Sequence, residues 1–172
     1  MRAAAAIVLV ASGLIVAPHH THASEAQSGL VDSYLDILDG DPDQQYALRR
    51  LLKVSREQGG LQPLLQRLRT RAAERPERLA RWLVLGHVLR AAGDKAGALQ
   101  AYEKAGEAAP KSPSPPGAIA RLHREARDFE RALEAYELAA SRARGEKRER
   151  LLREALEVGL ETGRLDEVER HA

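Results

Sequence analysis

Apolar residues in the middle of the chain recur at helical spacing. Trp82, Leu85, Gly86 and Leu89 fall at i, i+3, i+4 and i+7, so they share one face of a helix. A second stripe of this kind runs through residues 98–105, after a short break. The pattern predicts two amphipathic helices joined by a tight turn.

The same pattern returns every 34 residues along the chain. Three series of positions keep this step: Pro42, Pro76 and Pro110; Tyr34, Leu68, Tyr102 and Tyr136; and Gly59, Gly93 and Arg127. A fixed period of this kind is typical of repeat proteins, in which each unit buries its apolar face against the next. We expect an N-terminal helix within residues 24–44 and repeats over 45–172, divided into 45–78, 79–112, 113–146 and a partial unit at 149–172.

Composition supports an all-α fold. Aromatic residues make up 3% of the 172 residues, and the chain has one Phe and one Trp. A β-sandwich or barrel needs more β-branched and aromatic residues than this sequence offers. The chain has no Cys, which excludes disulfides, thiolate zinc sites and cysteine nucleophiles.

One repeat carries its key residues in a familiar order: Trp82, Leu85, Gly86, Leu89, Ala98, Tyr102, Ala105 and Pro110. This order resembles the tetratricopeptide repeat (TPR). The resemblance implies a right-handed α-solenoid of antiparallel helix pairs, with the first helix of each pair lining a concave face. It extends over most of residues 28–172.

Three positions predict how closely the helices approach. Gly86 and Ala120 are small at the point where two helices of a repeat should cross, so a close crossing is expected there. Leu52 occupies the equivalent position in the first repeat and predicts a looser or shifted contact. A final helix is expected at about Leu165 to Ala172.

The N-terminus has the features of a signal peptide. Arg2 precedes an uncharged apolar run from Ala3 to Ala17, which at helical rise is about 22 Å long and therefore short for a membrane span. Small residues at positions 21 and 23 suit cleavage before Ser24. We therefore expect residues 1–23 to be removed and the protein to be exported, to the periplasm or otherwise outside the cell.

Few residue patterns in the sequence indicate catalysis or the binding of a metal or cofactor. The sequence has no nucleophile elbow, phosphate-binding loop or HExxH motif, so we expect neither an enzyme nor a metal or cofactor site. The formal net charge is +2 with basic and acidic residues interleaved, which does not indicate nucleic-acid binding. No membrane span is expected in the mature chain.

The most informative surface is a row of basic residues. The resemblance implies that ligand-facing positions on the first helices form the concave wall of the solenoid. In this sequence they include Arg49, Lys53, Arg56, His87, Arg90, Arg121 and Arg124. A groove lined in this way would suit a protein or peptide segment with acidic side chains or a terminal carboxylate.

The competing interpretation is that these charges pair locally on exposed helix faces. Three pairs have i, i+4 spacing: Lys53 with Glu57, Arg121 with Glu125, and Arg153 with Glu157. Arg49 and Arg56 have no acidic residue at that spacing, and together with Arg90 they are the better candidates for binding a partner.

These observations favour a non-catalytic scaffold or adaptor of the bacterial cell envelope that binds a partner segment in its concave groove. The alternative is an N-terminal repeat domain of a longer envelope protein whose activity lies beyond residue 172.

Overall fold

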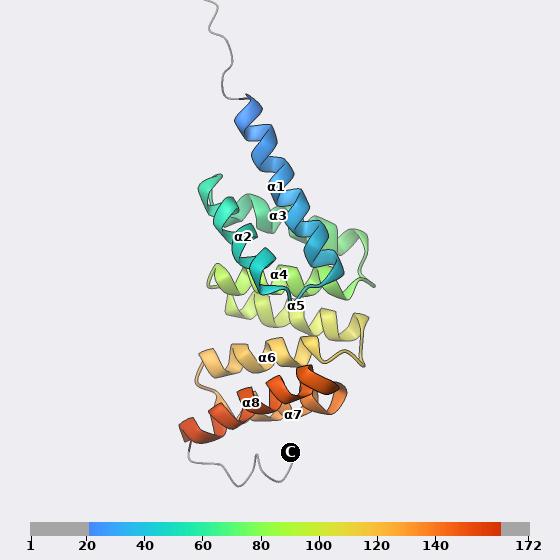
Figure 1. Ribbon diagram of the computed structural model, residues 1–172, viewed down its shortest axis with the longest axis vertical. Helices are drawn as coiled ribbons and strands as arrows, with labels where there is room; N and C mark the ends of the chain where they lie inside the picture. Colours follow the sequence, from blue (N-terminus) through green and yellow to red (C-terminus); the bar gives the residue numbers. More distant parts are fainter. Residues whose placement is uncertain (1–20, 163–172) are drawn as a thin grey trace, which may run out of the picture.

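The computed structural model describes residues 21–162, with side chains from 29 to 161. That part of the chain folds into helices without strands (Figure 1). The helices are α1 (Thr21–Gly40), α2 (Gln45–Glu57), α3 (Leu61–Glu74), α4 (Leu79–Ala91), α5 (Lys95–Ala108), α6 (Ser114–Glu125), α7 (Phe129–Arg142) and α8 (Gly145–Thr162). The expected all-α fold is confirmed.

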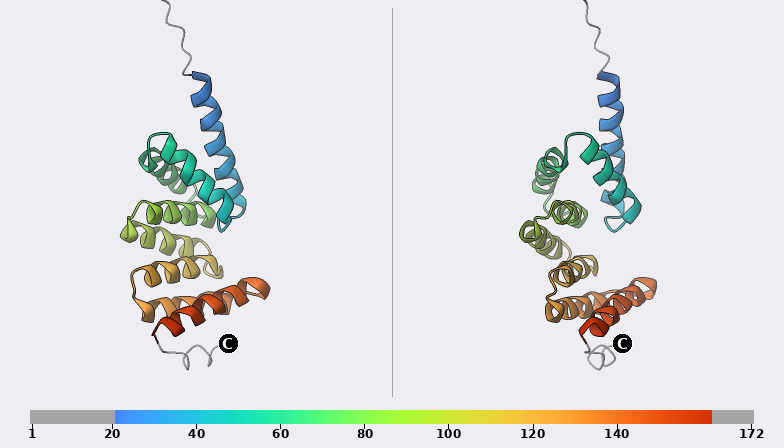
Figure 2. Two further views of the ribbon diagram at one scale, coloured as in Figure 1. Left: turned by 60° about the vertical axis from the view of Figure 1, so that its left-hand side comes forward. Right: turned by 90° about the vertical axis from the view of Figure 1, so that its left-hand side faces the viewer.

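Helices α3 to α7 follow one another along the long axis of the molecule, with α1 and α2 at one end and α8 beside α7 at the other (Figures 1 and 2). Helices α4 and α5 form one tight pair, α6 and α7 form a second, and α8 packs against α7. Short turns connect the partners of each pair, so consecutive helices run antiparallel. The result is an α-solenoid, and the pairs α2–α3, α4–α5 and α6–α7 lie within residues 45–78, 79–112 and 113–146.

Close crossings hold the second and third repeats together. A Cβ atom on Gly86 would lie 2.3 Å from Cε1 of Tyr102, so only glycine fits where α4 crosses α5. Tyr102 and Tyr136 are both fully buried, and Ala120 is buried at the equivalent crossing in the third repeat. The prediction of close crossings at Gly86 and Ala120 is confirmed.

The turns inside these repeats share their construction. Asp94 and Asp128 occupy equivalent positions and cap α5 and α7 by accepting hydrogen bonds from Gly97 N (2.8 Å) and Arg131 N (3.4 Å). The preceding residues have positive φ, +85° at Gly93 and +60° at Arg127. The third repeat therefore places an arginine in a conformation that favours glycine.

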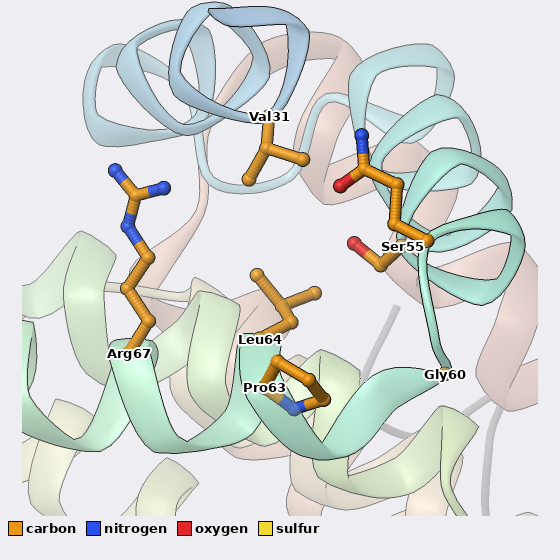
Figure 3. A pocket seen from close by; sticks show the side chains of 7 residues that line it. Val31, Ser55, Gly60, Pro63, Leu64 and Arg67 are labelled. Carbon is orange, nitrogen blue, oxygen red and sulfur yellow. The ribbon is translucent and has the colours of Figure 1, made fainter. Parts of the chain in front are cut away.

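The first repeat is built more loosely. Helix α2 packs mainly against α1 and diverges from α3 (Figure 2), as the larger Leu52 predicts. The divergence leaves a cavity of about 130 Å³ between α1, α2 and α3. Val31, Leu64 and the Ser55 hydroxyl point into it (Figure 3). The Ser55 side chain is buried, and its oxygen has no hydrogen-bond partner among the described residues.

The two ends differ from the sequence expectations in extent. The N-terminal helix was expected within residues 24–44, but α1 begins at Thr21, so the expected cleavage point before Ser24 falls in its first turn. Residues 1–20 and the expected final helix at 165–172 lie outside the described residues. Within residues 21–162, no helix combines the length and apolar character that a membrane crossing requires.

Candidate functional site: a concave groove lined by arginine and glutamate

A groove of about 510 Å³ lies along the first helices of successive units. Helix α4 contributes one wall, α6 the centre and α8 the other wall, while α7 contributes the buried ring of Tyr136. Three arginines and three glutamates line it: Arg90, Arg121, Arg124, Glu125, Glu154 and Glu161. Three of the predicted concave residues therefore share one groove, as expected for a solenoid.

Arg90 forms the first pair of the groove. Its Nη1 donates a hydrogen bond to Glu125 Oε1 at 3.2 Å, which links α4 to α6. The two residues are 35 positions apart in the sequence, close to the repeat length. The pair therefore joins equivalent faces of neighbouring units.

Arg121 and Arg124 continue the same arrangement from α6 to α8. Arg121 binds Glu154 with two hydrogen bonds, from Nε at 2.8 Å and from Nη2 at 3.2 Å. Arg124 donates to Glu157 at 2.9 Å and also to Glu161. Together with Arg90 and Glu125, these residues form a series of ion pairs that we call the Arg–Glu ladder.

The ladder affects the ionisation of its members. Hydrogen bonds to Glu161 and Glu157 raise the pKa of Arg124. Burial opposes the charge of Arg121, but the hydrogen bonds to Glu154 outweigh it and raise the pKa of that guanidinium. Burial, together with the Glu154 carboxylate, raises the pKa of Tyr136, so its hydroxyl stays neutral at physiological pH.

The local pairing expected from the sequence is only partly correct. Lys53 and Glu57 form the expected i, i+4 pair at 4.0 Å. The expected pairs of Arg121 with Glu125 and of Arg153 with Glu157 are wrong, because Glu125 binds Arg90 and Glu157 binds Arg124. In both cases the arginine of the preceding unit reaches the carboxylate in better geometry than the arginine of the same helix.

The predicted residues on α2 lie at the edge of this arrangement. Arg56 Nη2 donates a 3.5 Å hydrogen bond to the Ala91 carbonyl at the end of α4, which places it next to Arg90. Lys53 is exposed beside Glu57. Arg49 is exposed, and the described residues offer its side chain no hydrogen bond or ion pair.

His87 is placed differently from the expectation of a groove residue. Its side chain is 4% exposed, and Nδ1 lies 2.9 Å from the Tyr102 hydroxyl, within hydrogen-bond distance. Burial lowers the pKa of His87 to about 4, so the ring is neutral at physiological pH. We therefore assign His87 to the interior of the second repeat, since a partner in the groove could not reach it.

A further network, which sequence reasoning missed, lies at one end of the groove helices. Ser114 Oγ donates to Asp43 Oδ2 at 2.6 Å, and Lys147 Nζ donates to the same oxygen at 2.7 Å. Lys147 also donates to Ser114 Oγ at 2.7 Å. Burial of Asp43 opposes its ionisation, but these hydrogen bonds outweigh that effect and lower the pKa of the carboxyl.

This network joins the α1–α2 turn to the beginnings of α6 and α8. Asp43 and Lys147 are 104 residues apart in the sequence, and no short-range pattern connects them. The bridge thus connects the beginning and the end of the part of the chain that the structure describes. Among the described residues, no group of three His, Asp or Glu side chains could hold a metal ion.

The stacked antiparallel pairs and the groove along their first helices define a TPR-like α-solenoid. Neither a protein-family model nor a curated protein matches the sequence. A crystal structure of MamA aligns over 87% of this chain and 86% of the MamA chain, with a TM-score of 0.60 and 18% identity. A second MamA crystal structure aligns over 87% and 81%, with a TM-score of 0.57 and 17% identity. At this identity the likeness concerns the fold.

Proposed function

We propose that this protein is a non-catalytic scaffold that holds a segment of another protein in its concave groove. The observation that carries the proposal is the open groove of about 510 Å³, lined by paired charges on three first helices. Repeat solenoids present such surfaces preformed, so a partner can bind without reorganising the fold. The TPR-like architecture supports this role, because stacked helix pairs offer an extended surface that another protein can bind.

The partner segment is acidic or ends in a free carboxylate. In the Arg–Glu ladder, Glu125, Glu157 and Glu161 have the more exposed carboxylates, with 48%, 51% and 43% of the side chain accessible. An exposed ion pair contributes little, so a carboxylate of the partner can take the place of Glu125 on Arg90 or of Glu161 on Arg124. Arg121 stays bound to Glu154 and keeps α6 and α8 in position.

The basic side chains of α2 extend this surface beyond the groove. Arg56 lies beside the end of α4, and Arg49 and Lys53 follow on the exposed face of α2. A segment longer than the groove therefore meets further positive charge on α2. The proposed binding surface thus includes six of the seven predicted residues. The seventh, His87, is buried inside the second repeat.

We further propose that the scaffold works outside the cytoplasm. The support is the sequence pattern of residues 1–23, with a basic start, an uncharged apolar run and small residues before Ser24. N-terminal sequencing of the protein isolated from a bacterial host should give Ser24 as the first residue, in the periplasmic fraction or the medium. An intact Met1 terminus in the cytoplasm would contradict this location.

The groove can be tested with acidic peptides that carry a fluorescent label and either a free or an amidated C-terminus. Replacing Arg90 and Arg124 together with Gln should weaken binding at least about tenfold, because each loses a charged hydrogen bond to the peptide. Replacing Glu125 and Glu161 with Gln should strengthen it by a few fold, because Arg90 loses its internal carboxylate and Arg124 loses one of its two. Fluorescence anisotropy measures both changes.

The matched control is Glu130→Gln with Glu146→Gln, which removes two exposed carboxylates outside the groove. It should leave peptide binding unchanged. Equal binding by the wild type, the arginine double variant and the glutamate double variant would show that the groove does not select acidic segments. Capture of the same envelope protein by the wild type and loss of that capture by the arginine variant would identify the natural partner.

A further inference from the structure

The second repeat contains a complete site for an indole ring. Trp82 Nε1 donates a 2.9 Å hydrogen bond to the Pro76 carbonyl, and the Lys104 ammonium lies 4.7 Å from the centre of the ring. The surface beside the ring retains an opening of about 260 Å³ between α3, α4 and α5. Trp82 thus has an acceptor for its N–H group, a cation near its ring and apolar side chains beside it.

The third repeat has the same site without its tryptophan. Pro116 occupies the position equivalent to Trp82, and Leu138 occupies the position equivalent to Lys104. The corresponding surface opening, between α5, α6 and α7, is about 460 Å³. The positions Arg69, Trp82, Leu85 and Lys104 line the opening of the second repeat, and their equivalents Glu103, Pro116, Ile119 and Leu138 line that of the third.

The hydrogen-bond acceptor is retained. Pro110 occupies the place of Pro76 at the edge of the larger opening. Within the described residues, the Pro110 carbonyl accepts no hydrogen bond, whereas that of Pro76 accepts the indole N–H of Trp82. The floor is apolar, since it includes Ile119 and Leu138, and Leu138 is 45% exposed.

The charge around the opening is reversed. Leu138 replaces the cation Lys104, and Glu103 replaces Arg69. Glu107 adds a second exposed carboxylate one helical turn after Glu103, and neither is paired with any described residue. Arg142 also lines the opening, and the two carboxylates would attract a cationic residue next to an aromatic ring that enters here.

The geometry points to a docking site for a tryptophan side chain of a partner protein, flanked in the partner by Lys or Arg. We call this opening, lined by Glu103, Glu107, Pro110, Pro116, Ile119 and Leu138, the aromatic socket. It is separate from the concave groove, because Pro116 and Ile119 lie on a different face of α6 from Arg121 and Arg124. Its occupant enters as Trp82 does in the second repeat, with the indole N–H toward a proline carbonyl.

The test uses the amidated and acetylated peptides Gly-Lys-Trp-Lys-Gly and Gly-Lys-Leu-Lys-Gly with the ¹⁵N-labelled protein. The tryptophan peptide should shift the amide signals of Gly106, Ile119 and Leu138, with a dissociation constant in the millimolar range, as expected for a single anchoring side chain. The leucine peptide should bind at least about tenfold more weakly, because it lacks the ring and its N–H donor.

Two variants test the socket itself. Pro116→Trp fills the opening with an indole ring that belongs to the protein itself. It should therefore reduce binding of the tryptophan peptide at least about tenfold. Glu103→Gln with Glu107→Gln changes only exposed side chains, so its folding is not in question, and it should weaken binding several fold and remove most of its salt dependence. Glu130→Gln with Glu146→Gln is the matched control and should bind as the wild type does.

Equal affinity for the two peptides would overturn the proposal, as would unchanged binding by the Glu103 and Glu107 double variant. Signal changes confined to Arg90, Arg124 and their neighbours would also overturn it, because they would place the peptide in the concave groove.

Discussion

The first and second repeats occupy equivalent places in the same solenoid but pack differently. In the second repeat, Gly86 lets the Tyr102 ring lie against the α4 backbone, and Asp94 caps α5. In the first, Leu52 stands at the crossing, and Gly60 provides α3 with no side-chain cap. The two helices of the second repeat are therefore tightly paired, whereas those of the first diverge and leave a cavity of about 130 Å³.

This difference shows that the helix-pair geometry depends on very few positions. Both repeats carry the apolar stripes that form helices, so helix formation itself does not distinguish them. What distinguishes them is the pair of residues at the crossing, which is Gly86 and Tyr102 in the second repeat and Leu52 and Leu68 in the first. In the first repeat, α2 instead packs on α1, and its Arg56 reaches the end of α4 at the Ala91 carbonyl.

The largest effect is expected from Gly86→Ala, which makes the second repeat more like the first. The new methyl group would meet the buried Tyr102 ring at 2.3 Å, so we expect a loss of about 2 kcal/mol or more in the free energy of unfolding. Urea denaturation measures it. Gly106→Ala is the control, because its Cβ would have only an ordinary contact at 3.8 Å. It should be neutral or stabilising by up to about 1 kcal/mol.

The closed packing should also make the second repeat sensitive to acid. Burial lowers the pKa of His87 to about 4, below the value of about 6.5 expected in the unfolded chain. The unfolded chain therefore takes up a proton that the folded protein excludes, and stability falls as the pH decreases from 6.5 toward 4. Between pH 7.5 and pH 5, His87 should account for about 2 kcal/mol.

His87→Gln tests this contribution. Glutamine can still form a hydrogen bond with Tyr102 but does not titrate, so the decrease in stability between pH 7.5 and pH 5 should become smaller. An identical decrease in the wild type and the variant would show that other groups cause it.

A smaller effect should come from the cavity of the first repeat. Ser55→Ala removes a buried hydroxyl that has no hydrogen-bond partner among the described residues, and it should stabilise the protein by about 1 kcal/mol. The buried Ser114 is the contrasting case, because its hydroxyl binds Asp43 and Lys147. Ser114→Ala should destabilise by about 1 to 2 kcal/mol. Thermal unfolding of both variants would show whether the signs are opposite.

The smallest effect concerns the turn that the second and third repeats share. Arg127 has φ of +60°, where the second repeat has Gly93. Arg127→Gly relieves this conformation at the cost of a more flexible unfolded chain, and we expect a gain of up to about 1 kcal/mol. Gly93→Ala should lose about 1 kcal/mol. A destabilising Arg127→Gly would instead indicate that the contact of Arg127 with the Phe129 ring outweighs the backbone strain.

The fold could be predicted from the sequence because its signals are local and repeated. The constant step of the prolines, tyrosines and turn positions depends only on spacing along one chain. The effect of Gly86 and Leu52 could be predicted as well, since a residue at the crossing acts on the helix next in sequence. The presence of Arg90, Arg121 and Arg124 in one groove was implied by the resemblance to the tetratricopeptide repeat.

The contacts within the groove could not be predicted in this way. Glu125 and Glu157 each have a candidate partner four residues earlier, and the choice of Arg90 and Arg124 instead depends on the offset between neighbouring units. The burial of His87 depends on the rotation of α4 about its axis, which also decides what Tyr102 contacts. The bridge from Asp43 to Lys147 requires the curvature of the whole solenoid, which spacing alone does not define.

That bridge changes how the molecule should unfold. In most solenoids each unit is coupled only to its neighbours, so an end can fray without affecting the opposite end. Here Asp43, Ser114 and Lys147 connect the turn after the first helix to the beginnings of α6 and α8. Fraying of α8 therefore removes support from the α1–α2 turn as well, and the linear array acquires the cooperativity of a closed ring.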